Sequence, residues 1–328
     1  MKNKYKLVCT LFAILSVVFF SKNAIAEDTR KSAGFSMNPF FQEITLNKDQ
    51  DRAGFVLEIS NNTSSPAVFN LSVIDFGAMD ESGGVAFLGS SEDLMNKYSL
   101  ASWVSLQKDA IVLNPGETQS VDIFIENKES LSPGGHYAAI LAKLENESAD
   151  SAENKLEIAL QPSFASLIFA RKVGGEIQSL ALKDVERDNT MISLAEKIQL
   201  RFQNTGNVHI APRGTVKIID PLGREISNGV INNESALILP ETFRIYNVLL
   251  KKTALAIIPG KYRISIAYRY DGNDDFFIKE EYVDFFPMSA ILVGLSIIGL
   301  TMVYGVHRLR KKQRNARRIG QKSFKQKA

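Results

Sequence analysis

Cysteine is almost absent from this chain. The single cysteine, Cys9, lies in an apolar stretch near the N-terminus, and no thiol follows it. Disulfide bonds, thiolate metal sites and cysteine nucleophiles are therefore excluded from everything beyond that stretch. Any domain that folds there must be stabilised by its own hydrophobic core.

Histidine is nearly as scarce, with three residues in the chain. His136 stands beside a predicted turn and His209 lies inside a predicted strand. Ser-His-Asp catalysis needs a base oriented by a third group beside a positioned nucleophile, and no Gly-x-Ser-x-Gly context supports either histidine. Glycine pairs such as Gly134-Gly135 match no phosphate-binding loop and indicate turns. The sequence predicts a protein that is not an enzyme and needs no cofactor.

Acidic residues are missing from the C-terminal part of the chain, residues 285–328. Residues 285–306 carry no charge at all, and the tail 307–328 then holds ten Lys or Arg. Twenty-two helical residues cover about 33 Å, enough for a bilayer core of about 30 Å. We expect a transmembrane helix from Phe285 to Val306, with the basic tail held in the cytoplasm by the positive-inside rule.

The N-terminus indicates export. Three lysines precede the apolar stretch Leu7–Phe20, and Ala24-Ile25-Ala26 supplies small residues around a cleavage point. This pattern predicts a signal peptide over residues 1–26, cleaved between Ala26 and Glu27. The region 27–284 is then expected outside the cytoplasm, tethered to the cell membrane by a single pass.

Charge is divided unevenly between these regions. All 36 acidic residues lie in the region 27–284, together with 25 of the 39 basic ones, so its net charge is −11. Phosphate backbones are bound by clustered Lys and Arg, which this region lacks. The sequence therefore argues against a nucleic acid partner.

The region 27–284 contains a weak internal repeat. Its landmarks are a polar turn between strands, a Pro-centred turn and a Pro-Gly turn, at Asn61, Pro115 and Pro133 and again at Asn204, Pro240 and Pro259. A repeat of this length predicts two domains of one type. The first copy is longer between its first two landmarks, and we assign the insert to about residues 80–98.

The residue pattern within each copy is that of β-structure. Residues 262–270 alternate apolar and polar side chains, the period of a half-buried strand, and the turns are rich in Gly, Pro, Asn and Asp. Tyr137 and Tyr262 each follow a Pro-Gly turn and are placed like the tyrosine corner, whose hydroxyl bonds its own backbone. We expect an all-β protein of two immunoglobulin-like β-sandwich domains, followed by a single C-terminal transmembrane α-helix.

Domain limits follow from the turns between these patterns. Residues 171–175 form the expected boundary, which gives a first sandwich over 27–173 and a second over 174–284. Residues 146–154 contain Ser, Ala, Glu, Asp and Asn with no core residue and predict an exposed hairpin loop.

Two further features of the sequence are candidate binding sites. Trp103, the one tryptophan, could stack on a sugar ring, although a single Trp in a sandwich more often belongs to the core. Asp271, Asn273 and Asp275 are spaced as in a calcium loop, but Phe276 and Tyr282 occupy positions where that loop needs Gly and Glu. A hairpin turn explains this segment better, and no metal site is predicted.

Several segments together resemble a family of bacterial surface proteins. Phe35-Ser-Met-Asn-Pro, Phe55-Val-Leu-Glu-Ile-Ser-Asn-Asn-Thr, Trp103-Val-Ser-Leu with Leu113-Asn-Pro-Gly-Glu-Thr, and Pro133-Gly-Gly-His-Tyr-Ala-Ala-Ile are similar to the WxL-interacting family. That resemblance implies a peptidoglycan-binding first sandwich, a second sandwich that engages a surface protein, and a C-terminal span with a basic tail. Over residues 176–284 it extends to the architecture alone, and it identifies no ligand-contact residue.

The sequence thus predicts a membrane-anchored, non-enzymatic binding protein of the cell surface, in contact with peptidoglycan or another surface protein. Two alternatives stay open. One is a chaperone-like or assembly module that acts by β-strand addition at an exposed edge, which a long unpaired apolar edge would favour. The other is an enzyme or enzyme subunit, which would need a cleft with converging ionisable groups.

Overall fold

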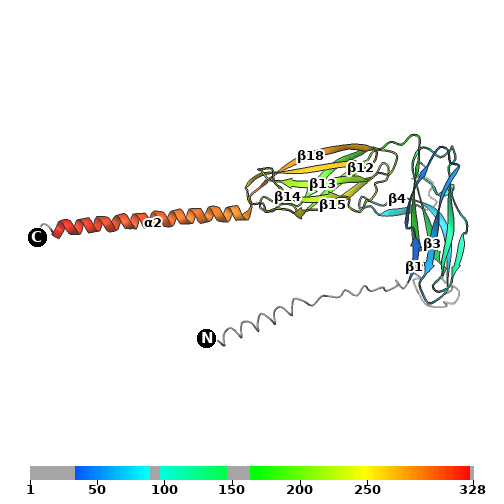
Figure 1. Ribbon diagram of the computed structural model, residues 1–328, viewed down its shortest axis with the longest axis horizontal. Helices are drawn as coiled ribbons and strands as arrows, with labels where there is room; N and C mark the ends of the chain where they lie inside the picture. Colours follow the sequence, from blue (N-terminus) through cyan, green and yellow to red (C-terminus); the bar gives the residue numbers. More distant parts are fainter. Residues whose placement is uncertain (1–33, 89–96, 146–162, 326–328) are drawn as a thin grey trace, which may run out of the picture.

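The computed structural model describes residues 34–88, 97–145 and 163–325. The first of two β-sandwiches lies across one end of the second, and a long helix leaves the opposite end of the second and continues along its long direction (Figure 1). The architecture predicted from the sequence, all-β with one C-terminal apolar helix, is confirmed. The predicted signal peptide, with its cleavage site at Ala26 and Glu27, lies outside the described residues, as does the predicted loop 146–154.

The first sandwich contains two sheets. One sheet has the order β1 (Phe35–Asn38), β3 (Arg52–Asn61), β8 (Thr118–Glu126) and β6 (Val104–Leu106). The other has the order β2 (Phe41–Leu46), β10 (Ser163–Lys172), β9 (Gly134–Leu144), β4 (Ala67–Ala78) and β5 (Val85–Leu88), with β7 (Ala110–Leu113) also paired to β4. Their facing apolar side chains, among them Leu57, Phe69, Ile123 and Ile140, form the first core.

Strand β9 is buried on both faces. Ala138, Ile140 and Ala142 point into the first core, whereas Tyr137, Ala139 and Leu141 belong to a separate apolar cluster. This explains its nearly continuous apolar sequence, because alternation disappears when neither face of a strand meets water. The second face of β9 is turned toward the other sandwich.

The second sandwich also contains two sheets. The smaller has the order β11 (Leu180–Arg187), β12 (Lys197–Asn204) and β15 (Phe243–Leu249). The larger has the order β16 (Lys251–Lys252), β14 (Glu225–Ile231), β13 (Pro212–Ile219), β17 (Gly260–Tyr270) and β18 (Asn273–Phe285). Their core includes Phe202, Val216, Ile264 and Ile266.

A fully buried asparagine occupies the same place in each sandwich. The Asn61 amide donates to the carbonyl oxygens of Ser65 and Leu113, at 2.8 and 3.0 Å. The Asn204 amide donates to those of Val208 and Ile238, at 2.8 and 2.9 Å. In both copies the side chain therefore fastens a polar turn to the residue two positions before a landmark proline.

Tyr262 forms a bond of the tyrosine-corner type. Its side chain is fully buried, and its hydroxyl donates to the carbonyl oxygen of Ile258, four residues earlier, at 2.8 Å. The bond ties the start of β17 to the Pro259-Gly260 turn that precedes it.

Replacing Tyr262 by phenylalanine is expected to reduce the free energy of unfolding by about 1 kcal/mol, because one buried hydrogen bond is lost while the ring stays. Chemical denaturation of the full chain measures the change. Tyr282→Phe is the matched control, since its ring is 56% exposed and its hydroxyl bonds an exposed glutamate. Equal effects of the two variants would contradict the assigned role.

Tyr137 differs from the prediction. Its hydroxyl lies 3.3 Å from Nδ1 of His209 in the second sandwich, not beside its own backbone. The ring packs against Phe76, Tyr98 and Phe169. The reason is the direction of the side chain, because odd-numbered residues of β9 face the other sandwich.

The C-terminal helix α2 (Met288–Lys325) begins later than predicted. Phe285 is the last residue of β18, is 5% exposed and packs edge-on against Tyr262, so it belongs to the second core and not to the span. The stretch Ala290–Lys311 is long and apolar enough to cross a membrane, with a mean hydropathy of 1.9, and none of it is buried in the protein. The helix passes Val306 without interruption and continues to Lys325.

Candidate functional site

The angle between the two sandwiches is filled by an apolar cluster, here called the elbow core. Phe76, Tyr98, Tyr137 and Phe169 come from the first sandwich, and Leu239 comes from the β14–β15 connection of the second. The aromatic rings meet edge to face, with Phe76 and Phe169 at 5.2 Å and Tyr137 and Phe169 at 5.4 Å. The His209 ring of the second sandwich packs edge-on against Tyr137 and Phe169, at 5.7 and 5.4 Å, so this cluster joins the two domains.

A polar chain crosses the elbow beside this core. Nε2 of the buried His209 lies 2.9 Å from Oε1 of Glu43 on β2, and its other ring nitrogen faces the Tyr137 hydroxyl. The hydrogen bond from His209 lowers the pKa of Glu43, and the Arg171 guanidinium 3.7 Å away acts in the same direction. Glu43 therefore stays ionised and holds the His209 ring in place.

The predicted insert supplies a second set of contacts between the domains. Both carboxylate oxygens of Glu81 accept from Arg201, each at 2.6 Å, and the Glu81 carbonyl accepts from the Ile245 amide at 2.7 Å. Glu241 accepts from Lys97 at 2.6 Å and from the Tyr98 hydroxyl at 3.0 Å. The basic partners lower the pKa of both carboxyl groups. Of the predicted insert, residues 89–96 lie outside the described residues.

Gly135 is required by the close approach of the two sandwiches. Its amide donates to the Asn207 carbonyl at 2.8 Å, and a Cβ on this residue would lie 3.3 Å from the Cα of Val208 in the second sandwich and 2.1 Å from the Tyr137 hydroxyl of its own strand. The Gly134-Gly135 pair thus opens strand β9 at the domain junction, which the prediction of a plain turn did not include.

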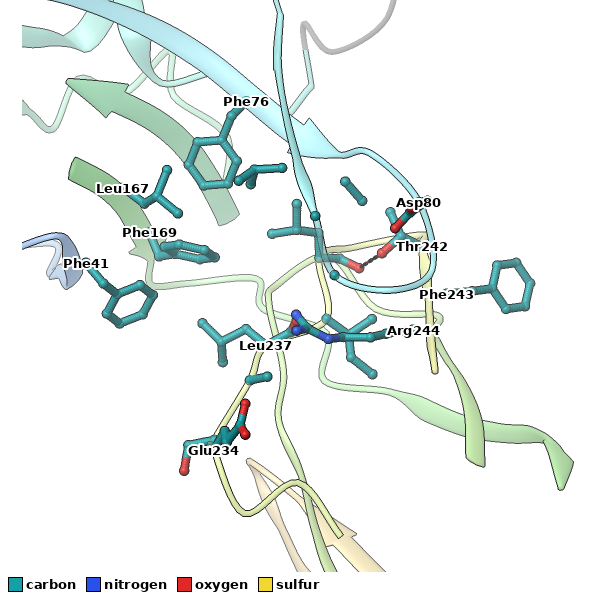
Figure 2. Close-up of a pocket in the computed structure, with 18 of the residues that line it drawn as sticks. Phe41, Phe76, Asp80, Leu167, Phe169, Glu234, Leu237, Thr242, Phe243 and Arg244 are labelled. Carbon is teal, nitrogen blue, oxygen red and sulfur yellow. Dashed lines mark hydrogen bonds between the residues drawn. The ribbon is translucent and has the colours of Figure 1, made fainter. Parts of the chain in front are cut away.

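A cavity of about 420 Å³ opens beside the elbow core. The first sandwich contributes Phe41, Phe76, Leu167 and Phe169 to its wall, and the second contributes Leu237, Glu234 and Arg244, as Figure 2 shows. The Arg244 guanidinium donates to the Leu237 carbonyl at 2.7 Å. The cavity is thus mainly apolar, and its charged groups are Glu234 and Arg244 of the second sandwich and Asp80 of the first.

Strand β2 borders this cavity and is the last strand of its sheet. Leu167 and Val173 donate to the carbonyls of Phe40 and Leu46, so the even-numbered residues of this segment bond with β10 and its extension. The backbone groups of Phe41, Glu43 and Thr45 therefore point to the open side, where no described strand pairs with β2. Phe40, just before the strand, is 75% exposed.

The other long edge strands of the described chain are protected. Lys183 and Arg187 lie on β11, and Lys279 lies on β18. The first sandwich covers part of the edge strand β15, where the Ile245 amide donates to the Glu81 carbonyl. Charged or covered edges resist the addition of a further strand. Among the described edge strands of more than four residues, β2 alone has neither Lys nor Arg.

The two candidate catalytic histidines, His136 and His209, have different surroundings. His136 is 2% exposed, and its ring nitrogens face the carbonyls of Ser99 and Ser132 at 3.1 and 2.8 Å. Burial lowers its pKa. His209 belongs to the elbow chain described above. Both rings are held by hydrogen-bonding partners through both of their nitrogens, which favours structural roles for the two histidines.

Trp103 and the Asp271 turn also have structural surroundings. Trp103 is partly buried against the first core, and the Lys128 ammonium lies 5.7 Å from its ring centre. The Asp271 carboxylate accepts from the Arg213 guanidinium at 2.8 Å and from the Ala211 amide. Among the described residues, no group of three or more His, Cys, Asp or Glu is arranged to hold a metal ion. Peptidoglycan contact through Trp103 stays a prediction.

The sequence did not predict the elbow core or the cavity beside it. The Phe40-Phe41 pair after Pro39 was a usable signal, since two adjacent aromatic residues cannot both face one core. Leu237 and Arg244 gave no such signal, because their place depends on the docking of the two domains.

No family model matches this chain, and no curated protein matches it. Solved structures with a similar fold include the class 5 fimbriae chaperone CfaA, at 10% identity over 76% of this chain and 99% of that one, with a TM-score of 0.39. The E. coli chaperone DraB has 16% identity over 76% and 98% of the chains, with a TM-score of 0.35.

A third similar structure is the CsuC–CsuE chaperone–tip adhesion subunit complex from the Csu pili of Acinetobacter baumannii. It has 9% identity over 76% of this chain and 98% of that one, with a TM-score of 0.36. Likenesses this distant concern the fold alone. Membership of the WxL-interacting family stays a prediction.

Proposed function

We propose that this chain is a membrane-tethered, non-enzymatic binding protein that captures an extended segment of a partner protein in its elbow. The segment adds as a strand to the open edge of β2 and places an apolar side chain in the adjacent cavity. The observation that carries the proposal is this juxtaposition of a lysine-free edge and an apolar cavity lined by both sandwiches.

The chemistry of the edge suits a peptide better than a sugar. Strand addition uses the backbone amides and carbonyls of Phe41, Glu43 and Thr45, which any extended peptide can pair. Side chains of the added strand alternate between its two faces, so every second one would point along the face of Phe41 and toward the cavity. Specificity would then come from the apolar wall and affinity from the backbone.

The charges around the cavity do not select an anion. Glu43 is paired with His209 and Arg171, and Arg213 is paired with Asp271. In the cavity wall itself the Arg244 guanidinium donates to the Leu237 carbonyl, and the carboxylates of Glu234 and Asp80 line the same cavity. We accordingly assign the site to an apolar peptide segment.

The tether completes the proposal. Helix α2 crosses the cell membrane with its uncharged part, which runs from Met288 to Val306, and this leaves the basic end of the helix in the cytoplasm and both sandwiches outside. The partner is a protein on the outer side of the membrane, where both sandwiches lie.

Thr45→Pro is expected to abolish peptide capture without unfolding the protein. Proline removes the amide hydrogen that faces the open side of β2, while the bonds from β10 to its even-numbered neighbours remain. Peptides would be selected from a random phage-displayed library against the full chain in nanodiscs, then synthesised and titrated against each variant. Enrichment of alternating apolar residues and loss of their binding to Thr45→Pro are the expected results.

Thr45→Ala is the matched control, because it removes the same side chain and keeps the amide. Leu167→Trp tests the cavity separately by filling it from β10, and it should weaken the same peptides while Thr45→Ala does not. Peptides that bind wild type and Thr45→Pro equally would exclude strand addition at β2. Pelleting of the full chain from detergent with insoluble peptidoglycan at high salt would favour the wall-binding prediction instead.

A further inference from the structure

Large exposed apolar side chains gather at one end of the second sandwich. They belong to three separate loops, here called the basal loops, which cover residues 188–194, 220–224 and 253–259. Their exposed side chains are Met191 (63%), Ile192 (53%), Leu222 (72%), Leu255 (80%) and Ile257 (51%). Single exposed apolar residues are ordinary, whereas convergence from three loops indicates a contact surface.

Contacts with the last strand place all three loops at the end where α2 begins. The amide of Phe286, just after β18, donates to the Met191 carbonyl at 2.6 Å. Gly260, at the end of loop 253–259, pairs with Phe285, and a Cβ on Gly260 would lie 3.1 Å from the ring of Pro221. The helix leaves the second sandwich at this same end (Figure 1).

The connection to the helix is very short. Strand β18 ends at Phe285 and α2 begins at Met288, so two residues separate them, Phe286 and Pro287. Both helix-proximal apolar residues, Phe286 and Met288, are about half exposed. The base of the sandwich therefore cannot stand away from the start of the helix.

The apolar part of the helix is no longer than the hydrocarbon core that it crosses. Its uncharged part runs from Met288 to Val306, and nineteen helical residues cover about 28 Å, against a hydrocarbon core of about 30 Å. To cross the core, the helix must enter it at its first turn. The membrane surface then lies at the level of Phe286 and the basal loops.

We infer that the basal loops insert into the outer face of the lipid bilayer, so that the second sandwich is seated on the membrane. The inference rests on the proposed crossing of the membrane by α2. Loop 253–259 is uncharged, and in loop 220–224 Asp220 pairs with Arg224 at 2.7 Å, which leaves Asp188 as the remaining charge of the three loops. Apolar side chains at this depth lie in the headgroup and acyl boundary.

Insertion of the basal loops into the bilayer sets the distance between the elbow and the membrane surface. The first sandwich lies across the end of the second sandwich that is opposite α2 (Figure 1). With the basal loops in the bilayer, the first sandwich is therefore held away from the membrane surface. Strand β18 has 13 residues and runs between the two ends, a length of about 43 Å at 3.3 Å per residue. The partner segment would be met at roughly this height above the bilayer.

Depth labelling tests the inference, and the near absence of cysteine makes it direct. In a Cys9→Ser background, Leu255→Cys, Ile192→Cys, Val230→Cys and Ile298→Cys would each carry an NBD fluorophore. The full chain is reconstituted in vesicles of phosphatidylethanolamine and phosphatidylglycerol, with and without doxyl-labelled lipid. Val230 is 60% exposed on the same sandwich away from the base, and Ile298 lies within the span.

Labels at Leu255 and Ile192 are expected to shift to shorter emission wavelength and to be quenched by doxyl lipid, as at Ile298, whereas Val230 is not quenched. If the Ile298 label is quenched while the labels at Leu255, Ile192 and Val230 are not, the seating is wrong and the membrane crossing stands. Absence of quenching at Ile298 would overturn the membrane crossing, and the seating with it. As a second test, Leu255→Glu combined with Ile257→Glu should reduce quenching at Ile192.

Discussion

Replacing Asn204 by alanine is expected to lower the free energy of unfolding of the second sandwich by about 3 to 5 kcal/mol. The side chain is fully buried, donates to two carbonyls and accepts from the Gly206 amide at 2.9 Å. Each buried polar group left without a partner costs about 1 to 3 kcal/mol. A loss of this size is a large part of the stability of an ordinary domain, about 5 to 15 kcal/mol.

Differential scanning calorimetry of the full chain measures this effect. Asn233→Ala is the control, since Asn233 is an exposed asparagine of the same sandwich and its removal should change stability by less than about 0.5 kcal/mol. Asn61→Ala should act on the first sandwich in the same way, because Asn61 makes equivalent bonds. If Asn204→Ala unfolds at the wild-type temperature, the amide does not fasten the turn.

Replacing Tyr137 by alanine is expected to remove about 3 to 5 kcal/mol and to uncouple the two sandwiches. The ring is 1% exposed and touches aromatic rings of its own sandwich and His209 of the other. Truncating a buried aromatic residue leaves a cavity that the surroundings fill only in part. Because this cavity lies at the domain junction, the variant should unfold in two transitions at separate temperatures.

Tyr137→Phe separates packing from hydrogen bonding. It keeps the ring and loses the 3.3 Å contact with His209, so a change of about 1 kcal/mol or less is expected. A large loss in Tyr137→Phe would mean that the hydroxyl, and not the ring, holds the elbow. A single unfolding transition in Tyr137→Ala would show that the salt bridges of Glu81 and Glu241 suffice for coupling.

Tyr137 and Tyr262 show which contacts a local sequence pattern can predict and which it cannot. Both follow a Pro-Gly turn and open a strand, and the sequence assigns them one role. Tyr262 has that role, because its hydroxyl reaches Ile258 four residues away. Tyr137 instead meets His209, 72 residues later. A bond within one turn can be predicted from spacing, whereas a bond between domains depends on how they dock.

Phe285 gives a similar contrast at the membrane end. An uncharged run shows that a span exists, since the hydrocarbon core admits few charges. Composition does not show where the strand stops, because a buried strand and a membrane helix are both apolar. The pairing of Phe285 with Gly260 decided this, and it moved the start of the helix to Met288.

The all-β class, the repeated sandwich and the apolar C-terminal helix could be predicted from the sequence. These follow from period-two alternation, turn residues and uninterrupted apolar length, which are properties of neighbouring residues. The tertiary structure alone decided the elbow cavity, the open edge of β2 and the gathering of the basal loops. The cavity and the basal loops each bring together residues far apart in the chain, such as Phe41 and Arg244 in the cavity wall, and no local pattern shows which distant surface a side chain will meet.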